Sequence, residues 1–108
     1  MAELDSTGRA SATIMARDEG GTPVISIAGE LDLSNMGQAK AAIDAALTSQ
    51  AQRLILELSE LEYMDSSGLA LLAAAARQAR EIELRDPSPM VRRLIEMTGL
   101  DQILRMTP

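Results

Sequence analysis

Residues 53–80 read RLILELSELEYMDSSGLALLAAAARQAR, and this stretch decides the fold. It opens with a short, mostly apolar run over residues 53–58, which is typical of a buried parallel strand. It closes with an Ala- and Leu-rich run over residues 69–80, a composition that strongly favours a helix. We interpret residues 59–64 as a connector, after which Asp65-Ser66-Ser67-Gly68 leads into the helix. The stretch therefore predicts a strand, a turn and a helix in succession.

The residues before this stretch predict a hairpin and a further helix. A short apolar stretch over residues 12–17 is separated from a β-branched run over 23–28 by a turn cluster that contains Gly20-Gly21. Two such runs across a glycine turn are typical of a β-hairpin. Apolar residues then recur at helical spacing, which predicts an amphipathic helix over residues 36–49.

The residues after it predict one more strand and one more helix. Residues 81–85 alternate polar and apolar side chains, as a half-exposed strand does. Ser88 as a cap and Pro89 at the first helical position predict the start of a helix over residues 89–98. Gly99 is suited to end that helix. Strands that alternate with helices after an initial hairpin predict an α/β fold. We expect a mixed sheet of four to five strands, with an N-terminal β-hairpin and helices mostly on one face.

Length and composition restrict the domain count and the classes of function. The chain has 108 residues, enough for one domain with its own core, and we expect a flexible N-terminus over 1–11 and a single domain over 12–108. It contains no cysteine and no histidine, which excludes disulfides, thiol chemistry and a Ser-His-Asp triad. A net charge of −6 argues against nucleic acid or an anionic membrane as the partner. Without a signal peptide or an apolar run long enough to span a bilayer, we expect a cytoplasmic protein with no membrane insertion.

The turn Asp65-Ser66-Ser67-Gly68 is the most informative local feature. Asp65 or Ser66 can accept hydrogen bonds from the free amides of the first helical turn. Gly68 lets another group approach the backbone closely. A serine hydroxyl here lies near the partial positive charge of the helix N-terminus, where a phosphate group is tolerated. A plain helix cap explains the tetrapeptide equally well.

Four motifs in order relate the chain to a known family. They are Gly29-Glu30-Leu31-Asp32, the strand Ile55-Leu56-Glu57-Leu58, the turn Met64-Asp65-Ser66-Ser67-Gly68-Leu69, and a late element over residues 88–100. Over residues 14–104 the sequence resembles the STAS domain family, and specifically the small bacterial anti-sigma-factor antagonists.

The resemblance implies a phosphorylation switch in a bacterial stress response. In the family, an anti-sigma factor that is itself a serine kinase phosphorylates the serine after the turn aspartate, which here is Ser66 and not Ser67. The unphosphorylated antagonist binds the anti-sigma factor and frees the sigma factor, and a PPM-type serine phosphatase resets the cycle. Asp32 matches a family position beside the turn. We therefore expect a partner-binding surface formed by Asp32, Asp65, Ser66, Ser67 and Gly68. We expect a monomer or weak dimer that is not an enzyme and has no catalytic residues, cofactor or metal.

The sequence departs from the family pattern in two places. The family usually has a few more residues between Arg80 and Glu81, so either the helix is shortened by about a turn or the next strand begins later. Residues 34–36 replace the more common Thr-Ala type of helix start. Neither change affects the serine turn.

Three alternatives differ in the class of function. One is a STAS accessory subunit without a phosphorylation cycle, which binds the ATPase of a lipid-transport ABC system. A second is an enzyme, with Ser66 or Ser67 as nucleophile or with Asp32 and Asp65 as an acid–base pair, but the chain has no Gly-x-Ser-x-Gly elbow. A third is a small nucleotide-binding module, for which the sequence offers no recognisable phosphate pocket.

Overall fold

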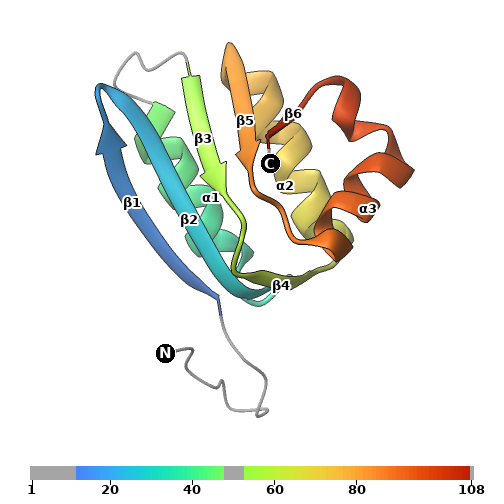
Figure 1. Cartoon of the computed structure of the whole chain (residues 1–108). Helices are drawn as coiled ribbons and strands as arrows, with labels where there is room; N and C mark the ends of the chain where they lie inside the picture. Colours follow the sequence, from blue (N-terminus) through green and yellow to red (C-terminus); the bar gives the residue numbers. More distant parts are fainter. Residues whose placement is uncertain (1–11, 48–52, 108) are drawn as a thin grey trace.

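The computed structural model describes residues 12–47 and 53–107, which form a mixed β-sheet packed against helices (Figure 1). In chain order the elements are β1 (Thr13–Glu19), β2 (Thr22–Leu31), α1 (Met36–Leu47), β3 (Arg53–Glu57), β4 (Leu61–Met64), α2 (Ser66–Gln78), β5 (Glu81–Arg85), α3 (Pro89–Thr98), the 3₁₀ helix η1 (Leu100–Gln102) and β6 (Arg105–Thr107). The predicted flexible segment 1–11 and the last two residues of the helix predicted over 36–49 lie outside the described residues.

The sheet follows the order β1-β2-β3-β5-β6, and β4 pairs with β2 outside this path. β1 and β2 form the antiparallel hairpin, whereas the remaining strand pairs are parallel. The predicted α/β fold with an N-terminal hairpin is confirmed. The sheet has six strands, and not the four or five expected, because the stretch interpreted as a connector contains β4 and because the three residues of β6 follow η1.

A bulge in β2 creates the place where β4 joins the sheet. β2 pairs with β3 over Val24 to Ser26, and then pairs with β4 from Gly29 onward with a shift of register after Gly29. Gly29 has φ +94°, a left-handed conformation that favours glycine. Its backbone N–H donates a hydrogen bond to the carbonyl of Glu60 at 3.0 Å. The bulge therefore places the carboxyl ends of β2 and β4 side by side, and both candidate turns begin there.

The core lies between the sheet and the helices α1 and α2, which pack behind the sheet in Figure 1. Its large side chains are leucines and isoleucines from alternating strand positions, and each contributes about 1.5–3 kcal/mol when fully buried. The helices oppose them with small and branched residues that allow close approach. The fully buried members include Ile25, Ile27, Leu31, Ile43, Leu54, Leu56, Leu58, Leu72, Leu84 and Ile95.

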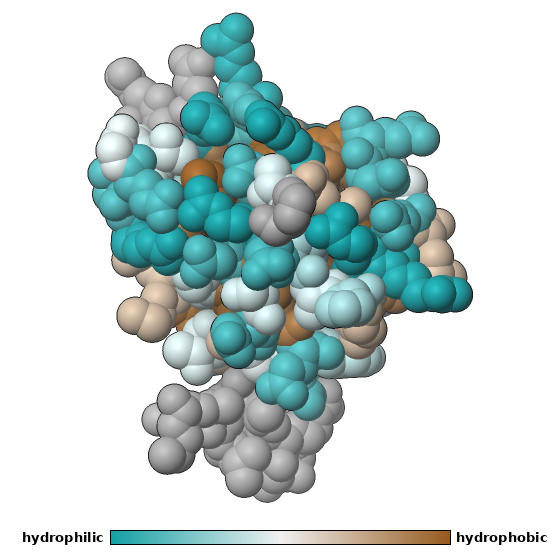
Figure 2. All heavy atoms as spheres, viewed as in Figure 1, coloured by the Kyte–Doolittle hydropathy of each residue, from teal (hydrophilic) through white to brown (hydrophobic). Residues whose placement is uncertain are grey.

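The opposite face of the sheet carries a layer of ion pairs. Figure 2 shows this face as mainly hydrophilic. The Arg17 guanidinium contacts the carboxylate of Glu57 at 3.0 Å and that of Glu19 at 2.8 Å. Arg85 contacts Glu19 at 3.2 Å. The pairing register puts these side chains, contributed by three strands, next to one another, so they cross-link the hairpin to the parallel part of the sheet.

The ends of helices α2 and α3 test the predictions made for residues 80–81, 88–89 and 99. α2 stops at Gln78, and Ala79 is already extended, so the shortened helix is the correct one of the two alternatives at Arg80 and Glu81. Pro89 lies in the first turn of α3, and Gly99 ends this helix with φ +77°, as predicted. Ser88 is the N-cap residue of α3, as expected, but its side chain does not cap the helix. Its hydroxyl donates instead to the Leu61 carbonyl at 2.9 Å and ties α3 to β4. In the described ranges, no helix is both long and apolar enough to cross a bilayer.

Candidate functional site

Asp65 caps the N-terminus of α2. Its Oδ1 accepts hydrogen bonds from the backbone N–H of Ser67 at 2.9 Å and of Gly68 at 3.3 Å, and the Ser67 hydroxyl donates to the same oxygen. These bonds satisfy amides that have no partner within the helix. Of the two capping candidates in the sequence, Asp65 is therefore the one that caps, and Ser66 becomes the first residue of the helix.

The same carboxylate links the serine turn to the turn after β2. The backbone N–H of Leu33 donates to Asp65, and the Asp65 N–H donates in return to the Leu31 carbonyl at 3.2 Å. The hydrogen bond from the Ser67 hydroxyl is the largest of the effects that hold the pKa of Asp65 below its usual value, and the amides of Gly68, Ser67 and Leu33 add to it. The carboxyl group is thus ionised at neutral pH, so Asp65 is unsuited to act as a general acid.

The turn after β2 is held by its own buried polar residues, Asp32 and Asn35. The Asn35 side chain accepts from the backbone N–H of Asp32 at 3.0 Å and donates to the carbonyl of Glu30 at 2.7 Å. Asp32 Oδ1 accepts from the backbone N–H of Ser34 at 2.9 Å. The turn is therefore fixed at both ends before α1 begins, and it presents Leu33 at its tip.

The two serines of the turn have different environments, although they are adjacent in sequence. Ser66 is exposed. Ser67 is half-buried, and both its backbone N–H and its hydroxyl donate to Asp65. A reagent or a protein approaching from solvent therefore meets the hydroxyl of Ser66, while that of Ser67 is engaged in the cap.

Gly68 is buried, and its close neighbour is a side chain of this protein. A Cβ atom at this position would lie 2.7 Å from Cγ and 3.0 Å from Sδ of Met64. Met64 is the last residue of β4 and is only 2% exposed. Packing against Met64 therefore explains why this position is glycine. The absence of a side chain allows the first turn of α2 to lie directly against the end of β4. The predicted contact of Gly68 with a partner stays a prediction.

A shallow depression joins the two turns. It has a volume of ≈ 320 Å³ and is lined by Asp32, Leu33, Ser34 and Asp65. The structure thus brings Asp32 and Asp65 to one edge of the sheet, although it does so through β4 and not through the strand at 53–58. Leu33 was not among the site residues predicted from the sequence. The signal that identifies it is an apolar residue between Asp32 and Ser34, just after the strand ends.

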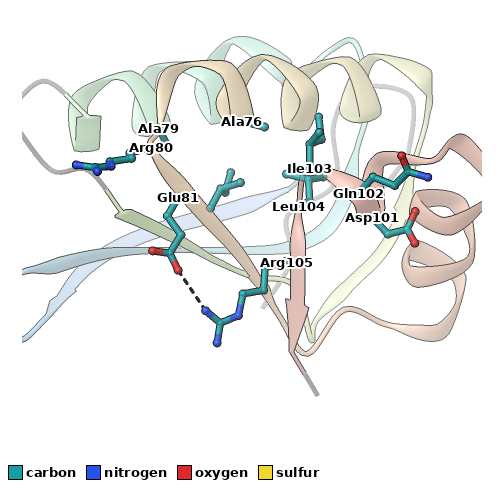
Figure 3. Close-up of a pocket in the computed structure, with 10 residues that line it drawn as sticks. Ala76, Ala79, Arg80, Glu81, Asp101, Gln102, Ile103, Leu104 and Arg105 are labelled. Carbon is teal, nitrogen blue, oxygen red and sulfur yellow. Dashed lines mark hydrogen bonds and ion pairs between the residues drawn. The ribbon is translucent and has the colours of Figure 1, made fainter.

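A second depression, of ≈ 390 Å³, lies at the other end of α2 (Figure 3). Ala76 and Ala79 line it on the α2 side, and η1 and β6 border it opposite. Glu81 and Arg105 point toward each other across neighbouring strands and form an ion pair at 3.2 Å. These groups lie on the side of the molecule away from the serine turn, so they form a separate surface.

Comparison with known proteins identifies the family. A family model described as "Mlab, STAS domain" matches residues 14–106, which is most of the chain. The chain belongs to the STAS domain family.

Individual relatives of this STAS domain are anti-sigma-factor antagonists. The anti-sigma-F factor antagonist RsfB of Mycobacterium tuberculosis is 31% identical, over 89% of this chain and 81% of its own. A crystal structure of an anti-sigma factor antagonist from Mycobacterium paratuberculosis is 31% identical with a TM-score of 0.85, over 91% of this chain and 86% of that one.

The antagonist SpoIIAA has been solved in two forms, and both resemble this chain. Its unphosphorylated form is 27% identical with a TM-score of 0.76, over 89% of each chain. Its phosphorylated form, from Bacillus, is 26% identical with a TM-score of 0.71, over 89% of this chain and 92% of that one. These relatives are regulatory proteins.

Proposed function

We propose that this STAS domain is an anti-sigma-factor antagonist. It binds an anti-sigma factor that is also a serine kinase, and this binding releases a sigma factor. Phosphorylation of Ser66 by the kinase ends the binding, and a PPM-type serine phosphatase restores it. The binding surface comprises Asp32, Asp65, Ser66, Ser67 and Gly68. The assignment is consistent with the anti-sigma-factor antagonists among its relatives, because this chain matches them over most of their length.

One observation carries the proposal: an exposed serine begins α2 directly after an ionised aspartate, Asp65, which itself lines a depression. Ser66 is accessible, whereas Ser67 is engaged by Asp65. Of the two hydroxyls, that of Ser66 is therefore the one a kinase can reach without disturbing the cap. The depression beside it is lined by two carboxylates, Asp32 and Asp65, so the surface around the serine is already acidic.

A phosphate on Ser66 acts on this surface through charge. It adds about −1.5 to −2 charges at neutral pH, with three strong acceptor oxygens. Within the isolated domain the N-terminus of α2 favours an anion, so the fold tolerates the group. In a protein–protein interface the same group repels the neighbouring carboxylates and must be desolvated. Every loss of about 1.4 kcal/mol weakens the affinity tenfold, so a few such contributions suffice to separate the two proteins.

Refolding is not required for such a switch. The antagonist SpoIIAA has this fold in its unphosphorylated form and in its phosphorylated form, and each resembles this chain at a TM-score above 0.7. We infer that the phosphate changes the surface of this STAS domain while the sheet and helices keep their arrangement.

The experiment that tests the proposal titrates purified variants against the anti-sigma kinases encoded in the source genome. Ser66→Ala should bind as tightly as the wild type and should accept no phosphate. Ser66→Asp should bind at least tenfold more weakly, because it places a negative charge beside Asp65, though with less charge than phosphate. Phosphosite mapping by mass spectrometry after incubation with ATP identifies the acceptor.

Ser67→Ala is the matched control. It removes the hydroxyl that Asp65 engages but leaves Ser66 in place, so phosphate should still be incorporated at Ser66. Phosphate found on Ser67 alone, or equal affinities for Ser66→Asp and Ser66→Ala, would contradict the assignment.

A second function has one specific observation in its favour, namely the description "Mlab, STAS domain" of the matching family model. In that case the domain is an accessory subunit that binds the ATPase of a lipid-transport ABC system, without a phosphorylation cycle. A pull-down from the native cell extract distinguishes the two functions by recovering either a kinase-like anti-sigma factor or an ABC ATPase.

A further inference from the structure

We propose that Leu33 is an apolar anchor that inserts into a pocket of the partner protein, and that this pocket is apolar inside and basic at its rim. The inference rests on the proposed function, because it takes the anti-sigma factor as the occupant of this surface. It adds to the proposed function one residue of this domain that determines the affinity for the anti-sigma factor. It also describes the surface that the anti-sigma factor must offer.

Leu33 is the large apolar side chain with the greatest exposure in the described part of the chain. It is 78% exposed, compared with 71% for Met97 on α3 and 55% for Ile103 after η1. Single exposed apolar residues are common on protein surfaces and need no explanation by themselves. Leu33 differs in its position, because it lines the depression that also contains the carboxylates of Asp32 and Asp65.

The backbone holds this side chain in place. The Leu33 N–H donates to the Asp65 carboxylate, which ties the tip of the turn to the N-terminus of α2. On one side Asn35 bonds the Asp32 N–H and the Glu30 carbonyl, and on the other side Ser34 donates to Asp32. Because the backbone of this turn is already ordered, burying the side chain in a partner costs only the rotamer freedom of Leu33 and no ordering of the loop. This is the property expected of an interface anchor, which fills a pocket near the centre of the contact.

The charges around Leu33 determine what the partner must offer. Asp32 and Asp65 both line the depression, and Asp65 is ionised at neutral pH because its pKa is lowered. A partner that buries Leu33 must bring its rim close to these carboxylates. Lysine or arginine side chains at that rim would be attracted to this negative charge, whereas an acidic rim would be repelled by it. The pocket is therefore apolar at its base and basic at its rim.

This arrangement also relates the anchor to the proposed switch. A phosphate on Ser66 would change the charge next to Asp65 and leave the Leu33 side chain unaltered. The two contributions are thus separable in an experiment, because apolar burial gives a negative heat-capacity change of binding that a charge does not.

Isothermal titration calorimetry measures both contributions. The probes are the purified anti-sigma kinases of the source genome, each titrated with the full chain at several temperatures. Leu33→Ala should weaken binding at least tenfold, or about 1.4 kcal/mol, and should make the heat-capacity change less negative. Leu33→Met should retain affinity within about threefold, because it preserves most of the apolar volume. Met97→Ala, a matched loss of an exposed apolar side chain on α3, should leave the affinity unchanged.

The outcomes separate this inference from the function on which it rests. If a kinase binds the wild type, and Leu33→Ala binds it equally tightly with an unchanged heat capacity, the anchor is refuted while the proposed function stands. If none of the kinases binds the wild type, both are refuted. Equal losses for Leu33→Ala and Met97→Ala would also overturn the anchor, since the effect would not be local. The melting temperature of each variant shows whether the fold is intact.

Discussion

Replacement of Gly68 by alanine tests whether packing against Met64 explains this glycine. Alanine is a better helix former than glycine by up to about 1 kcal/mol, and Gly68 lies in the first turn of α2. If nothing pressed against the glycine, Gly68→Ala would therefore stabilise the protein. The structure predicts the opposite, because the added Cβ would lie 2.7 Å from Met64 Cγ and 3.3 Å from Met64 Cβ.

The magnitude follows from how little Met64 can move. The closest atoms are Cγ, Sδ and Cβ of Met64, and the residue is only 2% exposed, so the clash requires repacking of the Met64 side chain in a filled core or a shift of β4 against α2. Overpacking of this kind costs about 1–3 kcal/mol. After subtraction of the gain in helix propensity, we expect Gly68→Ala to lower the free energy of unfolding by about 1 kcal/mol. For a domain of this size such a change lowers the melting temperature by about 4–8 °C.

A double-mutant cycle with Met64 isolates the contact. Met64→Ala alone should cost about 2–5 kcal/mol, because it leaves a cavity in the core. In the Met64→Ala background there is room for the new methyl group, so Gly68→Ala should become neutral or stabilising. Urea denaturation of the four proteins provides the four free energies of unfolding.

The cycle has a clear refuting result. If Gly68→Ala stabilises the wild-type background by the full propensity gain, Met64 does not press against this position and the packing explanation is wrong. Glycine at this position would then have to be explained by contact with a partner. Binding of Gly68→Ala to the anti-sigma factor, measured on the folded variant, decides that question.

Two further predictions concern stability away from the serine turn. Ser88→Ala should lower the free energy of unfolding by about 1 kcal/mol in urea denaturation, because the half-buried Ser88 hydroxyl bonds the Leu61 carbonyl of another element, β4. Thr98→Ala on the same helix should stay within about 0.5 kcal/mol, because the Thr98 side chain is exposed and its hydroxyl bonds only carbonyls of α3 itself. The pKa of Glu57 is lowered in the folded state, chiefly by its hydrogen bond to Arg17, so its contribution is present above pH 4.5 and is lost as the pH falls through the folded pKa. Glu57→Gln should therefore flatten the fall in melting temperature on acidification from pH 7, and an unchanged pH profile would contradict this.

Most of the architecture could be predicted from local patterns. The hairpin, the strand over residues 81–85 and the helix over 89–98 each follow from a periodicity bounded by glycine, proline or serine. The parallel strand after the first helix follows from an apolar run too short for another helix. These elements are determined by which side chains they bury, and burial leaves a period in the sequence.

β4 could not be predicted in this way. Its burial pattern is buried, exposed, exposed, buried, which is not the alternation of a strand. It joins the sheet through backbone pairing with β2 after the bulge at Gly29, and that bulge is a feature of the tertiary structure. The side-chain cap expected at Ser88 is absent for a related reason. The Ser88 hydroxyl donates to the Leu61 carbonyl in β4 and accepts no hydrogen bond from the amides of α3.

The sequence predicted where the candidate site lies but not all of the residues that form it. Asp32 and Asp65 were expected on one surface, because Asp32 matches a position that lies beside the serine turn in the STAS family. Leu33 was not found, since a strand that continued beyond Leu31 would have placed both leucines on the same buried face. The chain turns instead immediately after Leu31, and the Asp32–Asn35 hydrogen bonds fix that turn.

The geometry of the first helical turn explains how one serine can be a modification site while its neighbour is structural. Successive residues of a helix differ by about 100° in direction, since 3.6 residues complete a turn. Asp65 engages the side that carries Ser67 and leaves Ser66 toward solvent. The same carboxylate also bonds the Leu33 amide. The helix cap and the position of the proposed anchor therefore depend on Asp65 and not on the Ser66 hydroxyl. Charge can therefore be added at Ser66 without removing any hydrogen bond that holds the surface together, and a local switch of affinity needs no change of fold.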